Sequence, residues 1–197
     1  QRHLNGRELD QPRGKALGGS SSINGMTFLR GNPLDYDNWA NEEGCTGWSF
    51  ADCLPYFKKF ERPQEATGPM RGTEGPVAVK VQESLSPLNA AFLAGGQQAG
   101  HAFTSDVDGY QQEGVSRFEM TVENGYRMSA ARAYLHLKQR KATLDILTGA
   151  KVLRVLLQKG RASGVELSHR GQIRQLAAAR EVIMAAGVFG TPQILML

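Results

Sequence analysis

The stretch GKALGGSSSINGMTFLRG, residues 14–31, decides how the rest of the sequence is interpreted. It joins a glycine- and serine-rich turn to a short apolar run, and we interpret it as a loop that enters a helix. Glycines lack a Cβ, so their backbone can approach a ligand closely. A helix that begins just after them would direct free N–H groups and its positive dipole end at an anion, and a pyrophosphate suits that place.

Side chains around this turn could add to such a site. Ser20 and Asn24 would supply hydrogen-bond donors, and Arg13 and Lys15 would supply positive potential. Composition alone leaves a second interpretation open, in which the stretch is a mobile linker with two solvated cations.

Bulk composition is that of an ordinary globular chain. Of the 197 residues, 41% are hydrophobic and 21% are charged. No window approaches the ~18 consecutive apolar residues of a membrane span, so we expect a soluble protein. The net charge is +4 and the basic residues are scattered, which gives little support for nucleic-acid binding.

The cysteines and the chain ends carry two further expectations. Cys45 and Cys53 have neither CxxC nor metal-ligand spacing, so we expect reduced, partly buried thiols and no metal site. The chain starts at Gln1 rather than at a methionine, and its last residues, TPQILML, lie inside an apolar helical pattern with no cap. We therefore expect an internal piece of a longer polypeptide.

Helix signals dominate the first third of the chain. A short helix is expected at residues 35–40. Ser49 and Asp52 resemble a capping box, but a proline breaks a helix interior. The main helix is therefore predicted to begin near Pro55 and to end near Arg62.

The middle of the chain differs in composition from the first third. VAVKV, residues 77–81, has the pattern of a strand. Ser86 as N-cap, Pro87 at the first helical position and Gly100 as the stop predict a helix. Residues 106–126 are polar and glycine-spaced, which indicates a loop with short strands.

The last part alternates β-rich runs with tight turns. Lys159-Gly160 is placed to turn a hairpin. Near the end a strand, a glycine turn and a helix starting at Thr191-Pro192 follow one another, an order typical of a βα unit. The predicted elements are a helix in residues 129–140, strands at 143–148, 151–158, 162–167 and 181–186, and a turn at 187–190.

The pattern GKxLGGSSxINxxxFxxG, which begins at Gly14 and is followed by Asp37, resembles the first signature of the glucose-methanol-choline (GMC) oxidoreductases at every constrained position. Gly187 and the TPQIL that begins at Thr191 resemble the start of the second signature, although Val188 replaces the small residue usual there. DYDNWA, ADCLPYFKK, GYQQEG and SAARAYL are similar in order and spacing to the choline dehydrogenase branch. The resemblance covers essentially the whole chain.

This resemblance implies an α/β flavoprotein of two parts, with a partial FAD-binding Rossmann-like domain and part of a substrate domain that contains an antiparallel sheet. It implies three segments: residues 1–62 of the FAD-binding part with the first signature, residues 63–140 of the substrate domain, and residues 141–197 with FAD-domain strands and the start of the second signature.

The resemblance also implies the cofactor and its contacts. Some family members carry a histidine bonded to the flavin just before Asn24, and here that position is Ile23, so non-covalent FAD is expected. The backbone of Val152 would pair with the adenine edge, although Val152 could equally be a strand core residue, because the contact uses only the main chain. The cofactor-binding residues implied are Gly19, Ser20, Asn24, Gly25, Met26, Thr27 and Val152.

The expected activity is hydride transfer from an alcohol to the flavin, with choline oxidised to betaine aldehyde. The family's GxGxxG fingerprint would precede Gln1 and its catalytic histidine would follow Leu197, so no catalytic residue is assigned here. The partner is a small-molecule alcohol, with the electron acceptor and membrane association left open and a cytoplasmic or membrane-associated location expected. The chain's own histidines, expected to be surface or capping residues, are His3, His101, His136 and His169.

Other interpretations compete with this one. The chain could be a non-catalytic truncated remnant of such an enzyme, or an anion-binding module. Ser20, Ser21 and Ser22 lack a Gly-x-Ser-x-Gly elbow, which disfavours a serine hydrolase. An aromatic cage for a quaternary ammonium is conceivable, although packing is the simpler role for its members. Those aromatic residues are Tyr36, Trp39, Trp48 and Tyr110.

Overall fold

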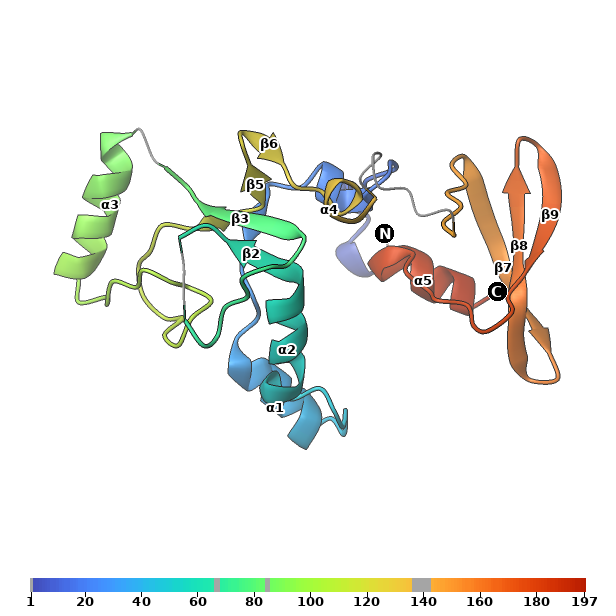
Figure 1. The fold of residues 1–197 in the computed structure, drawn as a ribbon, viewed down its shortest axis with the longest axis horizontal. Helices are drawn as coiled ribbons and strands as arrows, with labels where there is room; N and C mark the ends of the chain where they lie inside the picture. Colours follow the sequence, from blue (N-terminus) through green and yellow to red (C-terminus); the bar gives the residue numbers. More distant parts are fainter. Residues whose placement is uncertain (1, 66–67, 84–85, 136–142) are drawn as a thin grey trace. The chain divides into compact units, whose positions relative to one another are not determined.

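The computed structural model describes residues 2–65, 68–83, 86–135 and 143–197 (Figure 1). Its contacts divide the chain into two compact units, Gln1–Arg140 and Lys141–Leu197, and each unit is described by itself. Helices and sheets are mixed along the sequence, as the predicted α/β class requires.

The first unit is built on a four-stranded sheet with the order β1-β4-β3-β2. Its strands are β1 (Thr27–Phe28), β2 (Glu61–Pro63), β3 (Val77–Val81) and β4 (Glu119–Met120). β2 runs parallel to β3, and the other pairs are antiparallel. The strand expected at residues 77–81 is confirmed, and four of its five residues are buried because β3 lies in the interior of the sheet.

A small apolar core lies against this sheet. Phe28, Val77 and Val79 form it, with Phe60 and Ala133 packed beside them. Aromatic rings extend the core toward the helices: Tyr36 meets Trp39 with ring centroids 5.1 Å apart and Phe57 at 5.6 Å. These edge-on contacts agree with packing as the role of Tyr36 and Trp39. Trp48 and Tyr110 are largely exposed.

Two helices follow β1 and pack against one another. α1 (Pro33–Asn41) confirms the short helix, and Asn32 caps it by accepting from Leu34 N. α2 (Phe50–Phe60) begins five residues earlier than predicted, because Ser49 and Asp52 form a complete capping box. Pro55 lies inside α2 on its exposed side, where water can satisfy the one carbonyl that loses its partner.

The rest of the first unit contains two helices and a hairpin. α3 (Pro87–Gln98) confirms the predicted helix, with Ser86 as its cap and Gly100 just beyond it at φ +91°. β5 (Val122–Glu123) and β6 (Tyr126–Arg127) form a hairpin, and α4 (Ala130–Tyr134) follows it. The described part of the predicted helix in residues 129–140 ends at Tyr134. His136 and the rest of that prediction lie outside the described residues.

The second unit is an antiparallel sheet with the order β7-β8-β9. β7 (Ala150–Gln158) and β8 (Arg161–His169) are joined by the predicted turn at Lys159-Gly160, where both residues have positive φ. β9 (Gln172–Ala177) was not predicted, although Arg170-Gly171 turns the chain in the same way. His169 is buried on β8, so its expected surface role was wrong.

Two strand predictions in this unit were also wrong. Residues 144–147 and 181–186 form no strand, since a strand needs a hydrogen-bonded neighbour and none of the described residues pairs with them. α5 (Gly187–Leu195) begins four residues before the predicted start at Thr191-Pro192. Thr191 Oγ1 accepts from Ala186 N at 3.1 Å. A side chain inside α5 thus satisfies the N–H of the residue that caps the helix.

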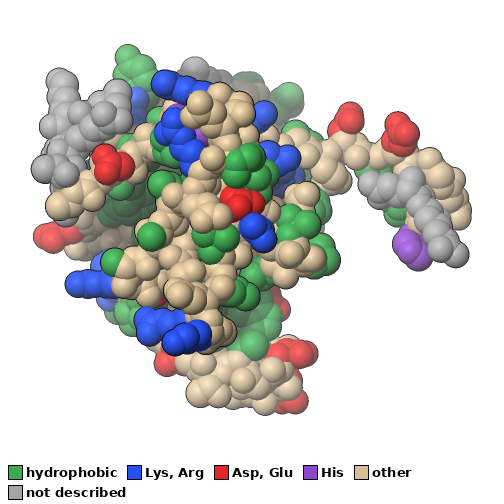
Figure 2. Space-filling model, turned by 90° about the vertical axis from the view of Figure 1, so that its right-hand side faces the viewer, with side chains coloured by type: hydrophobic (Ala, Val, Ile, Leu, Met, Phe, Trp, Pro, Cys, Tyr) green, Lys and Arg blue, Asp and Glu red, His purple; other side chains and the backbone are tan. Residues whose placement is uncertain are grey.

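Much apolar surface is uncovered. The chain exposes 14916 Å², whereas two separate compact globules of these sizes would expose roughly 11,000 Å². Hydrophobic side chains reach the surface at several places on the face drawn in Figure 2. Phe92 on α3 is 74% exposed and Ile183 is 80% exposed. No described helix has the length and apolar character needed to cross a membrane.

The cysteines lie near α2. Both are free thiols; Cys45 is exposed and Cys53 is partly buried, so the burial expected of both holds for Cys53 alone. Burial, reinforced by the nearby Asp52 charge, raises the pKa of the Cys53 thiol and keeps it protonated. Among the described residues no group of three or more His, Cys, Asp or Glu side chains could hold a metal ion.

Candidate functional site

The glycine- and serine-rich stretch folds as a tight turn followed by a strand. Residues Gly19–Ser22 form a single 3₁₀ turn, η2, and Thr27 already belongs to β1. The helix expected after the glycines was therefore wrong. A four-residue turn supplies almost no helix dipole, so any affinity for an anion must come from individual donors and charges. We call residues 14–27 the cradle.

Close backbone contacts fix the first half of the cradle. A Cβ on Gly14 would collide with the Gly19 carbonyl. Gly18 has φ +90°, and a Cβ there would come within 2.5 Å of Ser22 Oγ. Only glycine fits both positions, so these two glycines shape the turn rather than contact a ligand.

The second half of the cradle faces open space. A Cβ built on Gly19 or Gly25 would meet no atom within 4 Å. Ser20, Asn24 and Thr27 are exposed, although Ser20 Oγ accepts a hydrogen bond from Gly14 N at 3.2 Å. The predicted contact residues thus line a surface that a ligand can reach, from Gly19 through to Thr27.

Met26 bends the cradle in a strained conformation. Its φ is +64°, in the left-handed region that non-glycine residues seldom adopt. Its carbonyl accepts from Thr121 N at 2.9 Å, and its N–H donates to Asn24 Oδ1 at 3.1 Å. Strain of this kind persists only where surrounding contacts determine it, and it concentrates at functional sites.

Residues about a hundred positions further along hold the cradle in place. Arg127 Nη1 donates to Asn24 O at 2.6 Å and to Asn24 Oδ1 at 2.7 Å. Ser21 Oγ accepts from Ala130 N at 2.9 Å, at the start of α4. Sequence reasoning missed both anchors, and the only available signal was that Ala130 belongs to the family-like segment SAARAYL, which begins two residues after Arg127.

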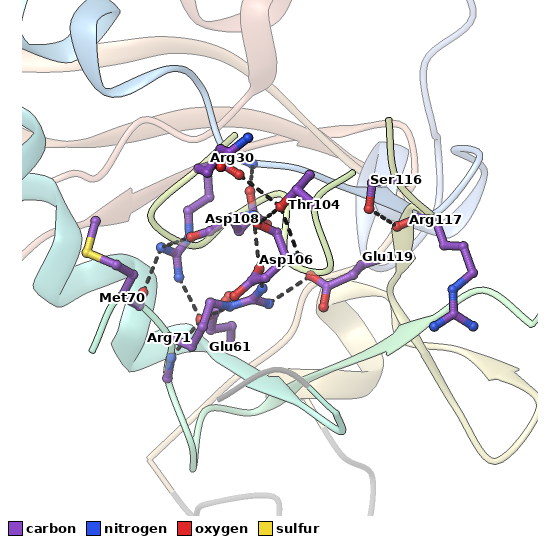
Figure 3. Close-up of polar contacts among 12 residues, drawn as sticks. Arg30, Glu61, Met70, Arg71, Thr104, Asp106, Asp108, Ser116, Arg117 and Glu119 are labelled. Atoms are coloured by element: carbon purple, nitrogen blue, oxygen red, sulfur yellow. Dashed lines mark hydrogen bonds and ion pairs between the residues drawn. The ribbon is translucent and has the colours of Figure 1, made fainter. Parts of the chain in front are cut away.

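A buried charge cluster fixes the other end of the same stretch (Figure 3). Arg30 Nη2 lies 2.6 Å from Glu61 Oε1, and Arg71 joins that oxygen at 3.1 Å. Arg71 also pairs with Glu119 at 2.8 Å and with Asp106. The cluster ties the end of β1 to β2, to β4 and to the loop that follows α3.

Carboxylates outnumber guanidinium groups in this cluster. Burial raises the pKa of Asp108 against the opposing hydrogen bond from Arg30 N, and burial likewise raises the pKa of Glu119 against Arg71. Burial opposes the charge of Arg71, but its carboxylate partners, led by Glu119, raise its pKa. Both arginines and Glu61 are buried and only Asp106 is partly exposed, so we interpret the cluster as a structural anchor rather than a binding site.

Val152 lies in the other unit, on β7. It pairs with Leu167 of β8, and the register shifts between Val152 and Arg154, which marks a β-bulge. In the described sheet β7 is an edge strand, so alternate N–H and C=O groups point away from β8. Free main-chain groups are therefore available along β7, although Val152 itself is half-buried.

A hollow of about 280 Å³ also lies on the first unit, lined by residues 30–34, Phe50 and residues 107–113. None of the predicted contact residues lines it. We assign the candidate site to the cradle because exposed donors, open glycines and a strained residue converge there.

Comparison with known proteins identifies the family of the chain. The GMC oxidoreductase family model matches residues 2–197. The chain belongs to the GMC oxidoreductase family, and the resemblance carried by residues 14–31 is confirmed.

Two curated relatives show which members of the family this chain is similar to. The chain is 45% identical over 194 residues to an oxygen-dependent choline dehydrogenase of Staphylococcus haemolyticus, covering 98% of this chain and 34% of that protein. It is 45% identical over 197 residues to the protein of the same name from Staphylococcus aureus, covering 99% and 34%. The chain thus spans about a third of the length of the curated relatives it matches.

Solved structures give the same fold. Pyridoxine 4-oxidase from Mesorbium loti superposes with a TM-score of 0.86 and 28% identity, over 93% of this chain and 36% of that one. A FAD-dependent oxidoreductase from Chaetomium thermophilum gives 0.87 and 29%, over 98% and 36%. The α/β flavoprotein fold implied by the sequence is confirmed.

Proposed function

We propose that this chain is the part of a FAD-dependent alcohol oxidoreductase that carries the cradle for the cofactor, and that choline, oxidised to betaine aldehyde, is the substrate. The observation that carries the proposal is the cradle itself. The open space beside the backbone of Gly19 and Gly25 leaves room for a flat, anionic ligand, and Arg127 binds the Asn24 amide between these glycines. The names of the curated relatives support choline as the alcohol.

The residues present fit FAD in chemistry as well as in space. A dinucleotide needs close backbone approach, neutral hydrogen-bond donors and a nearby positive charge. Gly25 gives the approach, Ser20 and Asn24 give donors, and Arg127 gives the charge. Val152, on an edge strand, would pair through its main chain with the adenine.

The chemistry itself belongs to the cofactor and to residues outside this chain. Bound FAD would supply the acceptor, flavin N5, for the hydride of the carbinol carbon, and a base would take the hydroxyl proton. No residue of this chain is assigned as that base. The cradle residues would bind and orient the cofactor, and the buried contacts of Arg30 and Arg71 with Glu61 hold the end of β1 against β2.

FAD is held without a covalent bond in this proposal. Ile23 occupies the position where some family members carry a flavin-bonded histidine, and its hydrocarbon side chain has no atom that could form such a bond. Acid precipitation of the full-length protein should release all flavin into the supernatant. Flavin that stays with the pellet would contradict this part of the proposal.

The electron acceptor is proposed to be molecular oxygen, because the relatives are named oxygen-dependent. An oxygen electrode should record consumption when choline is added to the full-length protein. Turnover that requires an added dye and consumes no oxygen would instead favour a respiratory acceptor.

The uncovered apolar surface supports a role within a longer polypeptide rather than as an independent anion-binding module. Large apolar side chains are exposed along the whole length of the chain, Phe92 and Ile183 among them, and apolar surface of this extent is typical of a contact with further protein. We expect the isolated chain to be marginal in stability. A monomeric chain with one cooperative melting transition would contradict that expectation.

Asn24→Ala in the full-length protein tests the assignment of the cradle. Flavin occupancy after purification should fall, because the donor beside the open glycines is lost. Asn41→Ala is a matched control, since Asn41 is an exposed residue at the end of α1. Unchanged occupancy and redox potential in Asn24→Ala would show that the contact has been misplaced.

A further inference from the structure

The hydrogen bonds around Asn24 fix which way its amide points. Asn24 Oδ1 accepts from Arg127 Nη1 at 2.7 Å and from Met26 N at 3.1 Å. Both of these groups are donors, so the atom facing them must be the amide oxygen and not the nitrogen. The Nδ2 group, with two N–H donors, is consequently the part of Asn24 that a ligand in the cradle can meet.

Arg127 holds more than the side chain of Asn24. The same Nη1 donates to the main-chain oxygens of Asn24 at 2.6 Å and Ser21 at 3.3 Å. Three acceptors thus converge on one guanidinium nitrogen, all from residues 21–24. This arrangement fixes the backbone on both sides of Ile23, as well as the amide orientation.

The support for Arg127 is itself rigid. Its neighbour Met128 is buried and donates through its N–H to Thr121 O at 2.8 Å. Thr121 N donates in turn to Met26 O at 2.9 Å. The β5–β6 hairpin and the residues that flank it therefore contact the second half of the cradle at Ser21, Asn24 and Met26.

The charge of Arg127 has no acidic counterpart nearby. Among the described residues, no carboxylate lies within ion-pair distance of its guanidinium group, whereas Arg62 on β2 pairs with Glu123. Its positive potential is therefore directed at neutral carbonyls beside the open part of the cradle. A guanidinium in this position favours additional negative charge on a ligand next to it.

We propose that Arg127 is a positioning residue for the flavin site: it holds the Asn24 amide so that its N–H donors face the cofactor, and it fixes the backbone of residues 21–26 in the cradle conformation. This inference rests on the proposed function, because it assigns to Arg127 a role toward FAD. It goes beyond that function in identifying a residue outside both signatures as a determinant of cofactor binding.

The test compares variants of the full-length flavoprotein by FAD affinity and flavin reduction potential. Arg127→Met should weaken FAD binding by about ten- to a hundredfold, the worth of one or two hydrogen bonds to a charged group. The potential should fall, because reduction adds negative charge where positive potential has been removed. Arg127→Lys, which keeps the charge without the three-way geometry, should lie between Arg127→Met and wild type in both measurements.

A double-mutant cycle separates positioning from general stability. If Arg127 acts partly through the Asn24 amide, Arg127→Met should cost less affinity in an Asn24→Ala background than in wild type, because the loss of the oriented amide is then counted once; the backbone contacts and the charge account for the cost that remains. Asn24→Asp should keep the bond to Arg127 as an ion pair but lose the donors, so its apoprotein should stay folded while FAD binding weakens. Arg132→Met is the matched control: Arg132 lies on α4 over the Tyr126 ring at 4.7 Å, and its loss should change neither measurement.

The two proposals fail in different ways. If Asn24→Ala weakens FAD binding but Arg127→Met leaves affinity and potential at wild-type values, Arg127 is not the positioning residue. Additive losses in the double mutant would overturn the inference as well. If the wild-type full-length protein binds no flavin, the proposed function fails and the inference fails with it. Should Arg127→Met not fold, Arg127→Lys and Asn24→Asp decide by the same criteria.

Discussion

Arg71 and Arg127 each join segments that lie far apart in the sequence, but they hold different partners. Arg71 is sealed, with a 1% exposed side chain, and it binds the carboxylates of Glu61, Asp106 and Glu119. Arg127 is half-buried, and within the described part of the chain its guanidinium group donates to neutral oxygens only. The comparison shows how one residue type can complete an anchor in one place and leave charge available to a ligand in another.

Loss of the sealed arginine should have the largest effect. Arg71→Met leaves three carboxylates without their shared cation, so the free energy of unfolding of the full-length protein should fall by about 3–5 kcal/mol. Denaturant titration measures the change. Arg154→Met is the control, because the Arg154 side chain is largely exposed and its pair with Glu166 should contribute far less than the buried contacts of Arg71. Equal stability of Arg71→Met and wild type would contradict the role of Arg71 as a structural anchor, and with it the contrast with Arg127.

The accessible half of the cradle, which Arg127 contacts, can be tested at Gly25. Gly25→Ala places a methyl group in space that only a ligand would occupy, so FAD affinity should fall about tenfold while stability changes little. Gly14→Ala should reduce both, because its Cβ would collide with the Gly19 carbonyl. Thermal melting of the apoprotein and FAD titration separate these outcomes. Full FAD affinity in Gly25→Ala would mean that no ligand lies against this backbone.

The smallest expected effect is a pH dependence of the sealed cluster. Asp108 and Glu119 have pKa values raised in the folded state, so they bind protons more readily folded than unfolded. Their contribution to stability is greatest at the acid end and is lost as the pH rises from about 4 through the raised values. Asp108→Asn should flatten this slope in denaturant titrations at several pH values. An unchanged slope would show that Asp108 does not titrate with folding.

Local signals predicted much of the fold. β3, α3 and the Lys159-Gly160 turn followed from a buried apolar run, a Ser-Pro start and a two-residue hairpin pattern. These features depend on residues close together in the sequence. The Arg170-Gly171 turn carried a similar signal and could have been predicted in the same way.

The failures have physical reasons that sequence alone conceals. α2 begins at the capping box of Ser49 and continues through Pro55, because that proline faces solvent. Residues 181–186 have strand composition, but pairing needs a neighbour that local composition cannot supply. The helix expected after the glycines is absent because Thr27 and Phe28 pair with β4, a strand far away in the sequence, and Thr121 N binds the Met26 carbonyl.

The candidate site likewise has one part that the sequence could predict and one part that it could not. Gly19 to Thr27 could be selected from one contiguous motif. Arg127 and Ala130, which hold that motif, lie more than a hundred residues away in sequence, and only the folded chain brings them to it.

One measurement tests the central claim most directly: an experimental structure of the full-length protein purified with its flavin. Our account predicts FAD lying along the cradle, with Asn24 Nδ2 about 3 Å from a cofactor acceptor and Gly25 in contact with the cofactor. FAD bound elsewhere, with residues 19–27 facing solvent, would contradict it.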